Sequence, residues 1–523
     1  MEAFSDLLEQ LYFTSSHNAK SALIIDYLRQ TPDPDRGWAL AAMAGTLRFD
    51  FFKRNTIKQL MLERIDPVLF DLSYDYVGEM SETVAHLWPD VSDKPAALPG
   101  LAQIVDGFMQ AKRHEVKPLL VDYLNQMNAA QRWALIKLGT RGLRIGVSAR
   151  SVKQILARYG DKPVTEIEAL WHGVEPPYTE LLHWLEGRAA KPDISQRVTF
   201  HPVMLAHPVD ETTLENLSPG QWQVEHKYDG IRVQLVCTPH GKALFSRTGD
   251  DISGAFPDLL ETVTEEGVID GELLVMQGST VESFNRLQQR LNKKKPTKKL
   301  MSELPAGLIA YDILADHEQD YHQHPLHKRR IALQHYLQRS DSNRLHLSQQ
   351  LPADTLSELR QRYAQACQDT AVEGLMLKRS DSLYVPGRPK GQWFKWKREP
   401  RLVDAVLMYA QRGHGKRSSF YSDFTFGAWQ GETLLPIGKA YSGFTDEELK
   451  KLDNWVRRNT TGRFGPVREL AKALVIEVAF DAAHPSNRHK SGVALRFPRF
   501  HRIRWDKPAA EADTLDTVLA MIE

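Results

Sequence analysis

The apolar pattern of this chain changes once, near residue 200, and that change limits the folds open to it. Before it, apolar residues recur at three- and four-residue spacings in segments such as 5–11, 19–29 and 151–159, which is typical of amphipathic helices. After it, short β-rich runs alternate with Gly and Asp turns. A helical part followed by strand-rich parts predicts a multidomain α+β protein.

The second part of the chain predicts a mixed α/β domain and then a smaller β-rich domain. Strands are expected over residues 233–237, 268–275, 308–313, 375–378 and 393–396. Helical patterns over 281–291 and 326–338 lie between some of them. With 523 residues, three domains are expected: a helical domain over 1–197, a mixed α/β domain over 198–400 and a compact β-barrel-like domain over 401–523.

Composition removes several classes of protein. The chain is 42% hydrophobic and 25% charged, which is ordinary for a globular protein. Two cysteines cannot make a disulfide framework or a four-thiolate zinc site. Neither a membrane-length apolar run nor a signal-peptide pattern is present, so a cytoplasmic protein without a membrane partner is expected. Residues 401–507 hold 19 Lys and Arg against 11 Asp and Glu, a modest basic excess that suits a polyanion.

A lysine beside a tight turn is the first residue with a chemical interpretation. The segment reads Glu225-His-Lys227-Tyr-Asp229-Gly230-Ile-Arg232. A lysine amine attacks phosphorus or a carbonyl only when it is neutral, so it needs nearby cations or burial to lower its pKa. The segment alone is equally compatible with a surface hairpin turn.

Further charged residues follow within predicted strands. Asp270 and Glu272, two residues apart, fall on one face of a strand, and Glu373 enters a second apolar strand. Lys395 and Lys397 share one strand face, which is unfavourable unless an anion lies between them. Acids placed beside apolar runs need a cation or a metal nearby.

In this order, these segments resemble the lysine-dependent nucleotidyltransferases, and specifically the ATP-dependent DNA ligases. The resemblance spans nearly the whole chain. It extends from Gly142-Leu-Arg144-Ile-Gly146 through the lysine segment to Arg496-Phe-Pro498-Arg499. It implies an all-α DNA-binding domain, a mixed α/β nucleotidyltransferase (adenylation) domain and a C-terminal OB-fold β-barrel.

The resemblance also implies roles for individual residues. Lys227 becomes the nucleophile that takes AMP, and Lys395 and Lys397 complete the catalytic set. Glu272 and Glu373 are the implied ligands of Mg²⁺, or of Mn²⁺ in its place. The implied contacts to ATP are Glu225, Arg232, Arg247, Glu272, Tyr311, Arg388, Lys395, Arg499, Arg502, Arg504 and Lys507. Pro389 occupies the position where the family usually has an arginine, and its neighbours Arg388 and Lys390 are the candidates to replace it.

The implied substrate is nicked double-stranded DNA. AMP passes from Lys227 to the 5′-phosphate, and the 3′-hydroxyl then displaces AMP and seals the strand. Arg144, Arg150 and Lys153 are the candidate DNA contacts. A monomer that encircles DNA is expected, in the cytoplasm of a bacterium and associated with its nucleoid. Replication, repair and recombination all remain open as the pathway.

Three alternatives share part of this pattern. RNA ligases and mRNA capping enzymes use the same lysine chemistry, but they usually lack a helical domain such as 1–197. NAD-dependent ligases carry zinc cysteines that are missing here. A catalytically dead nick-binding scaffold is disfavoured because Lys227, Glu272, Glu373, Lys395 and Lys397 are all intact.

Overall fold

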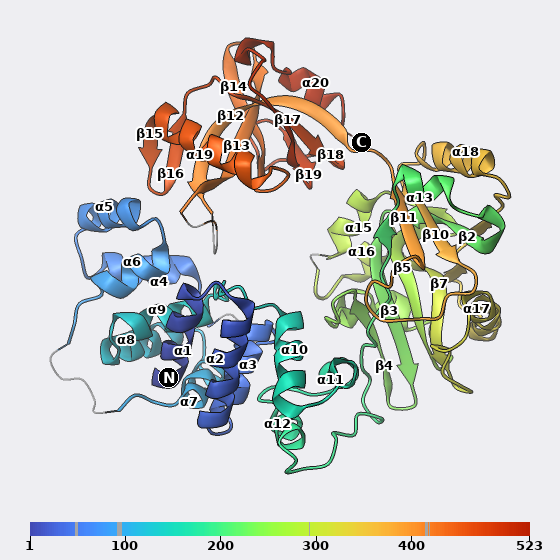
Figure 1. Ribbon diagram of the computed structural model, residues 1–523, viewed down its shortest axis with the longest axis horizontal. Helices are drawn as coiled ribbons and strands as arrows, with labels where there is room; N and C mark the ends of the chain where they lie inside the picture. The colour runs from blue at the N-terminus through green and yellow to red at the C-terminus, as the bar shows by residue number, and fades with distance from the viewer. Residues whose placement is uncertain (48–50, 92–96, 292, 414–416, 418, 523) are drawn as a thin grey trace. The chain divides into compact units, whose positions relative to one another are not determined.

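The computed structural model describes residues 1–47, 51–91, 97–291, 293–413, 417 and 419–522 (Figure 1). These residues form two compact units. One unit comprises 168–173 and 193–399, and the other comprises 1–167, 174–192 and 400–523.

The N-terminal region is helical. Its helices are α1 (Glu2–Phe13), α2 (His17–Gln30), α3 (Asp35–Ala44), α4 (Arg54–Leu62), α5 (Pro67–Val77), α6 (Met80–Leu87), α7 (Leu101–Gln110), α8 (Val116–Gln126), α9 (Ala129–Gly139), α10 (Ala149–Gly160), α11 (Val164–Trp171) and α12 (Thr179–Leu185). The predicted helical segments 5–11, 19–29 and 151–159 fall within α1, α2 and α10 and are confirmed.

Helix α10 shows why this part of the chain is helical. Val152, Ile155 and Leu156 are buried at three- and four-residue spacings, so one face of the helix packs into the protein. The side chain of Ser148 caps the helix by accepting a hydrogen bond from the backbone N–H of Ser151.

The unit that contains residues 193–399 is built on two sheets. The five-stranded sheet has the order β1 (His207–Pro208), β11 (Trp393–Lys397), β10 (Val372–Arg379), β2 (Trp222–Tyr228) and β9 (Gln350–Leu351). The six-stranded sheet has the order β4 (Gly241–Ser246), β3 (Ile231–Thr238), β5 (Gly267–Gln277), β7 (Ala306–Asp316) and β8 (Leu345–Leu347), with β6 (Thr280–Val281) paired to β5.

Helices cover these sheets. They are α13 (Glu211–Glu215), α14 (Pro257–Leu260), α15 (Phe284–Leu291), α16 (Lys298–Glu303), α17 (Leu326–Ser340) and α18 (Leu356–Ala366). Val236 and Leu314 of the six-stranded sheet share one apolar cluster with Trp393 of the five-stranded sheet, so the two sheets meet through their side chains. The helix expected over 281–291 begins later, at Phe284, because Val281 belongs to strand β6 and pairs with Met276 of β5.

The C-terminal part is a curled β sheet consistent with an OB fold. Its seven strands are β12 (Arg401–Arg412), β13 (Tyr421–Gln430), β14 (Thr433–Ala440), β15 (Thr460–Phe464), β16 (Val467–Leu470), β17 (Val475–Phe480) and β20 (Arg499–Arg504). Strands β18 (Ala482–Pro485) and β19 (Val493–Arg496) pair as a separate two-stranded sheet. Helices α19 (Asp446–Asn459) and α20 (Leu515–Leu519) complete this part of the chain.

Strand β12 explains the curl of this sheet. Its first half pairs with β17 and its second half pairs with β16, while its other edge pairs with β13. The register against β13 shifts between Leu407 and Tyr409, and such a bulge bends a strand. The fold class predicted from the sequence, with a helical region, a mixed α/β domain and a C-terminal OB-like sheet, is confirmed.

Candidate active site

One face of the five-stranded sheet gathers several of the predicted residues. Two rows cross strands β2, β10 and β11, with Glu225, Met376 and Lys395 in one row and Lys227, Gly374 and Lys397 in the other. Residues directly across a ladder project to the same side of a sheet. The sheet therefore brings one acid and three lysines together on one surface.

Glu373 joins this surface through a β-bulge. In the pairing of β10 with β2, Val372 lies opposite Tyr228 and Gly374 lies opposite Lys227, so Glu373 has no residue across from it. A bulge re-aims the extra residue's side chain. Gly374 has a φ of +142°, and a Cβ there would lie 2.0 Å from the carbonyl oxygen of Trp396, so only glycine fits.

Glu373 forms ion pairs with two of the lysines. Its Oε2 atom lies 3.0 Å from Nζ of Lys227 and 3.3 Å from Nζ of Lys397. Burial acts to raise the pKa of Glu373, but the charges of the two lysines outweigh it and lower that pKa to about 2. Glu373 therefore stays a carboxylate at any physiological pH.

Lys395 is surrounded by positive charge. Burial is the main cause that lowers its pKa, and Lys227, Lys397, Arg388 and Arg247 lower it further. The predicted residues Arg247 and Arg388 are both exposed. This collection of cations is suited to a phosphate group, whose negative charge would relieve their repulsion.

The six-stranded sheet contributes Glu272. Glu272 in β5 pairs with Arg232 in β3 and is half-buried. Burial raises the pKa of Glu272 to about 7, and the charge of Glu373 adds to this effect while Lys227 opposes it. Glu272 and Glu373 are therefore close enough to interact although they come from different sheets.

These two carboxylates fit the donor set that Mg²⁺ needs. Mg²⁺ binds through one or two carboxylates and completes its shell with water and substrate phosphates. Among the residues that the structure describes, no group of three or more His, Cys, Asp or Glu suits a metal ion. A metal held here would therefore depend on phosphate oxygens as well as on the protein.

Tyr311 reaches the site through a second bulge. Asp312 pairs with Asp270 and Ala310 pairs with Gly271, which leaves Tyr311 of β7 without a residue opposite in β5. The ring is half-buried, and burial raises the pKa of its hydroxyl. The Nζ atom of Lys378 lies 4.3 Å from the ring centroid of Tyr311.

Arg232 takes part in a buried hydrogen-bond network. It donates from Nη1 to the carbonyl of Met204 at 2.6 Å and from Nη2 to Oδ2 of Asp270 at 2.8 Å. The hydroxyl of Tyr384 donates to the same carboxylate oxygen. Asp270 is fully buried, and the guanidinium of Arg232 neutralises its otherwise costly charge while the Tyr384 hydroxyl adds a hydrogen bond.

Glu225 is held by two cations that the sequence did not single out. Its Oε1 atom lies 3.0 Å from Nη1 of Arg330, and its Oε2 atom lies 2.6 Å from Nζ of Lys378. In a strand, alternate residues lie on one face, so Gly374, Met376 and Lys378 share the face of the sheet that carries the site. The sequence pattern could therefore have identified Lys378. Arg330 lies in a helix, where no pattern points to Glu225.

His226 lies on the opposite face of β2 from Lys227. It is directly across from Leu375 of β10, and burial lowers its pKa. Its ring packs edge to face against Tyr228, with ring centroids 5.7 Å apart. This histidine is therefore part of the packing behind the site surface.

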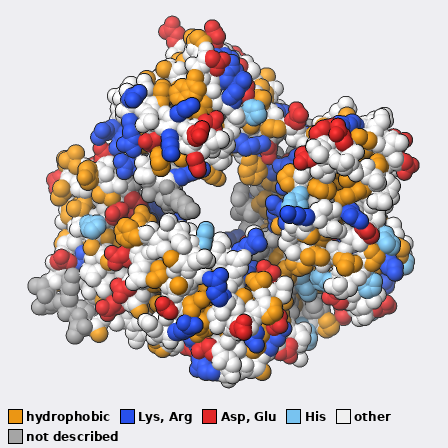
Figure 2. Space-filling model, viewed as in Figure 1, with side chains coloured by type: hydrophobic (Ala, Val, Ile, Leu, Met, Phe, Trp, Pro, Cys, Tyr) orange, Lys and Arg blue, Asp and Glu red, His pale blue; other side chains and the backbone are white. Residues whose placement is uncertain are grey.

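The predicted C-terminal cations are paired with carboxylates of their own module. Arg499 lies 3.1 Å from Asp481, Arg502 lies 3.5 Å from Glu477, Arg504 lies 3.1 Å from Asp506, and Lys507 lies 2.6 Å from Asp404. Figure 2 shows several Lys and Arg side chains on the visible face of the C-terminal module. The side chain of Arg502 is 60% exposed, so a ligand could still reach it.

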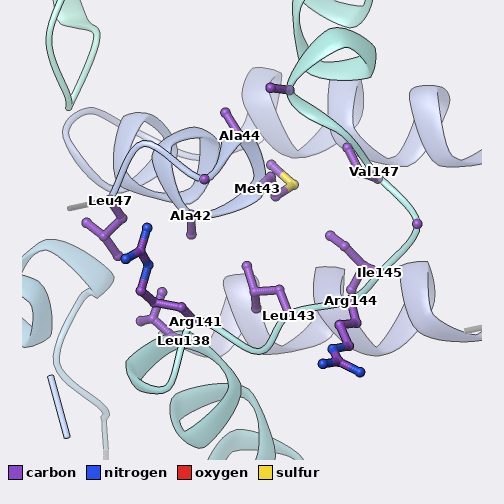
Figure 3. A pocket seen from close by; sticks show the side chains of 13 residues that line it. Ala42, Met43, Ala44, Leu47, Leu138, Arg141, Leu143, Arg144, Ile145 and Val147 are labelled. Carbon is purple, nitrogen blue, oxygen red and sulfur yellow. The ribbon is translucent and has the colours of Figure 1, made fainter. Parts of the chain in front are cut away.

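In the helical region, Arg144 lines a pocket of about 360 Å³ (Figure 3). Arg144 has a φ of +43°, an uncommon backbone conformation for a residue with a side chain. Arg150 and Lys153 lie in the first turns of α10, whose N-terminus follows the pocket segment.

In the described part of the chain, no helix has the length and apolar character needed to span a membrane.

Comparison with known proteins identifies the family. The family model for the ATP dependent DNA ligase domain matches residues 203–397, and the model for the ATP dependent DNA ligase C terminal region matches residues 417–507. A probable DNA ligase of Koribacter versatilis is 35% identical over 424 residues, which cover 76% of this chain and 73% of that protein.

Two further similarities extend over all or nearly all of the chain. DNA ligase 1 of Korarchaeum cryptofilum is 25% identical over 551 residues, covering 100% of this chain and 98% of that protein. The solved structure of Pmar-Lig_PreS3 shares the fold with a TM-score of 0.63 at 16% identity, over 96% of this chain and 99% of that one. The chain belongs to the family of ATP-dependent DNA ligases.

Proposed function

We propose that this ATP-dependent DNA ligase seals nicks in duplex DNA through an adenylate carried on Lys227. The observation that carries the proposal is the ion pair of 3.0 Å between Lys227 and Glu373, on a sheet face that also presents Lys395 and Lys397. A lysine that attacks the α-phosphate needs a surface that attracts phosphate, and the lysines of this sheet face supply it.

In the first step, Nζ of Lys227 attacks the α-phosphorus of ATP. The N–P bond forms, the bond to the β-phosphate oxygen breaks, pyrophosphate leaves and the lysine loses a proton. Lys395 and Lys397 stabilise the charge that grows on the α-phosphate. In the second step AMP passes to the 5′-phosphate of the nick, and in the third the 3′-hydroxyl displaces AMP.

Glu272 and Glu373 are the proposed ligands of Mg²⁺, with Mn²⁺ able to replace it. Their oxygens are the donors that a hard cation prefers. The raised pKa of Glu272 shows that its negative charge is only partly compensated by the protein, so a bound cation would stabilise it. When bound, the metal neutralises phosphate charge.

The nucleotide contacts divide between base, sugar and phosphates. Glu225 and Tyr311 are proposed to hold the adenine, and Arg232 and Glu272 the ribose side. Arg247 and Arg388 are proposed phosphate contacts, because their charges already act on Lys395. Arg388 thereby replaces the arginine that the family usually has where this chain has Pro389.

The proposed domains are residues 1–197 for DNA binding, 198–400 for adenylation and 401–523 for the OB fold. Arg499, Arg502, Arg504 and Lys507 are proposed to contact the β- and γ-phosphates of ATP, exchanging their present carboxylate partners for phosphate oxygens.

DNA is proposed to contact Arg144, Arg150 and Lys153. The support is the position of these cations in the pocket segment and in the first turns of α10, where helix N–H groups also favour an anion. A monomer that encircles DNA, acting in a bacterial cytoplasm, completes the proposal.

The experiment is transfer of label from [α-³²P]ATP to the purified protein without DNA, followed by a chase with nicked duplex. Wild type is expected to retain the label through denaturation and to release it on sealing the nick. Lys227→Ala is expected to take no label, whereas the control Lys299→Ala, whose side chain is 85% exposed, labels normally. Label that discharges only onto RNA ends would overturn the proposal.

A further inference from the structure

The four C-terminal cations proposed to contact the β- and γ-phosphates are electrically balanced by their own module. Each pairs with a separate carboxylate, and these acids are Asp404, Glu477, Asp481 and Asp506. In these pairs, four positive charges face four negative ones. A set of cations that only had to attract a highly charged anion would keep a positive excess.

Two of these acids, Asp404 and Glu477, form an acidic row across the sheet. Asp404 of β12 is directly across from Glu477 of β17, and Glu477 is directly across from Arg502 of β20. Residues across a ladder project to the same side, and like charges directly opposite each other destabilise a sheet. The stability of the sheet therefore does not explain the acidic row.

The acidic row is more buried than the cations that it holds. The side chain of Arg502 is 60% exposed, and that of Glu477, which lies 3.5 Å away, is 16% exposed. Lys507 is 22% exposed, and its partner Asp404 is 11% exposed. A phosphate group that approaches this face therefore meets the cations before it meets the acids.

Asp404 acts on two cations through one oxygen. Its Oδ2 atom lies 2.6 Å from Nζ of Lys507 and 3.6 Å from Nη1 of Arg504. Its Oδ1 atom is buried and has no hydrogen-bond partner among the residues that the structure describes. The hydrogen bond to Asp404 raises the pKa of Lys507, so this lysine stays charged. The charge of Asp404 is therefore its main contribution to this face.

Pyrophosphate has to leave these cations once the first step is complete. A phosphate oxygen that binds a cation takes the place of a carboxylate, and that carboxylate stays fixed on its strand close by. Its negative charge repels the bound anion, and partial burial limits the screening of this repulsion by water and salt. The acidic row therefore lowers the affinity of the cations for the product.

We propose that Asp404 and Glu477 are built-in competitors of pyrophosphate and set how readily the product of the first step leaves. They hold Arg502, Arg504 and Lys507 when no phosphate is bound, and they take these cations back from pyrophosphate. Both act through the cations, so they are positioning residues. The inference rests on the proposed contact of these cations with the phosphates of ATP.

The test uses the reverse of the first step, in which an oxygen of pyrophosphate attacks the phosphorus of lysyl-AMP. The bond between phosphorus and Nζ of Lys227 breaks, ATP leaves and the amine takes up a proton. Full-length protein that carries ³²P-labelled AMP is mixed with pyrophosphate at a fixed concentration of free Mg²⁺. The measured quantity is the pyrophosphate concentration that gives half-maximal release of ATP.

The variants are Asp404→Asn and Glu477→Gln, which keep the size of each side chain and remove its charge. Glu432→Gln changes an exposed acid of the same module and is the control, expected to match wild type. Arg502→Ala removes a proposed phosphate contact and is expected to raise the half-maximal pyrophosphate concentration.

Each acid variant is expected to lower the half-maximal pyrophosphate concentration by about three- to tenfold, and the gain is expected to shrink as salt is added. The KM for ATP in protein labelling is expected to fall as well. Sealing of a pre-adenylated nick, which involves no pyrophosphate, stays within about twofold of wild type. A damaged fold lowers rates but does not tighten the binding of an anion, so tighter binding separates this role from a structural one.

The inference fails for an acid whose substitution leaves the half-maximal pyrophosphate concentration unchanged or raises it. If Arg502→Ala raises that concentration while the acid variants leave it unchanged, only the inference is overturned. If Arg502→Ala also leaves it unchanged, the phosphate contact proposed for the cations is overturned as well. A wild-type adenylate that pyrophosphate cannot discharge would refute both.

Discussion

Lys227 and Glu373 lie 3.0 Å apart because β10 carries one residue more than β2 at the point where the two strands meet. Without that extra residue, strict alternation would place the side chains of Glu373 and Gly374 on opposite faces, and Gly374 is the one across from Lys227. The position of the carboxylate that pairs with Lys227 and Lys397 is therefore a product of the bulge.

Glu373→Gln tests the charge of this carboxylate while keeping its size. Lys227 and Lys397 then lack their counter-charge, and a proposed metal ligand is lost, so formation of lysyl-AMP is expected to fall by about 10²–10³-fold. Single-turnover labelling with ATP measures the rate. The exposed Glu261→Gln serves as the control, and a rate equal to wild type would remove Glu373 from the proposed mechanism.

Gly374→Ala tests the bulge itself. The added Cβ would lie 2.0 Å from a backbone oxygen at a φ of +142°, so the strand must shift. We expect the free energy of unfolding to fall by about 2–4 kcal/mol and labelling to fall with it. Denaturant unfolding followed by fluorescence gives the first value.

Gly391→Ala is the matched control for that substitution. Gly391 has a φ of +70°, but a Cβ there meets no atom within 4 Å. Its cost is therefore limited to backbone strain of about 1–2 kcal/mol. If both variants lose the same stability, close packing against Trp396 is not what requires glycine at position 374.

The sequence predicts strands and faces better than it predicts bulges. The apolar runs over 233–237 and 393–396 are strands, because alternation is a local property that the residues carry themselves. Glu373 and Tyr311 each occupy an extra position whose effect depends on the partner strand's register. No spacing within either segment reveals that register.

Partners brought from distant elements were also beyond the sequence. Glu225 meets Arg330, which is 105 residues away on α17, and Arg232 meets Asp270 through strand pairing. Such contacts require the tertiary fold. The helix expected over 281–291 starts late for the same reason, since Val281 is taken into a strand by a tertiary pairing.

Arg502→Ala tests the proposed role of the C-terminal cations. Its guanidinium lies on β20 at 3.5 Å from Glu477, and its side chain is 60% exposed. Loss of one phosphate contact is expected to slow labelling by ATP about 10²-fold, while sealing of a pre-adenylated nick stays near wild type. Arg488→Ala, an exposed residue of the same module, is the control, and equal losses in both assays would contradict the role.

The shifted pKa values of Glu272 and Glu373 make the stability of the metal-free protein depend on pH. Burial raises the pKa of Glu272 from 4.5 to about 7. Between these two pH values, Glu272 of the metal-free folded protein therefore keeps a proton that the same residue has lost in the unfolded chain. In that window the folded state holds more protons, and the free energy of unfolding therefore falls as the pH rises. Glu373 acts in the opposite sense, because its lowered pKa gives stability that is present above 4.5 and lost toward pH 2.

A metal ion must displace the proton of Glu272, so the apparent affinity for Mg²⁺ is expected to rise about tenfold per pH unit below 7 and to level off above it. The measurement is the Mg²⁺ concentration that gives half-maximal labelling, taken from pH 6 to pH 8.5. Glu272→Gln cannot ionise, so it is expected to need more Mg²⁺ and to show little of this slope. A wild-type requirement that stays constant between pH 6 and pH 7 would show that Glu272 does not bind the metal.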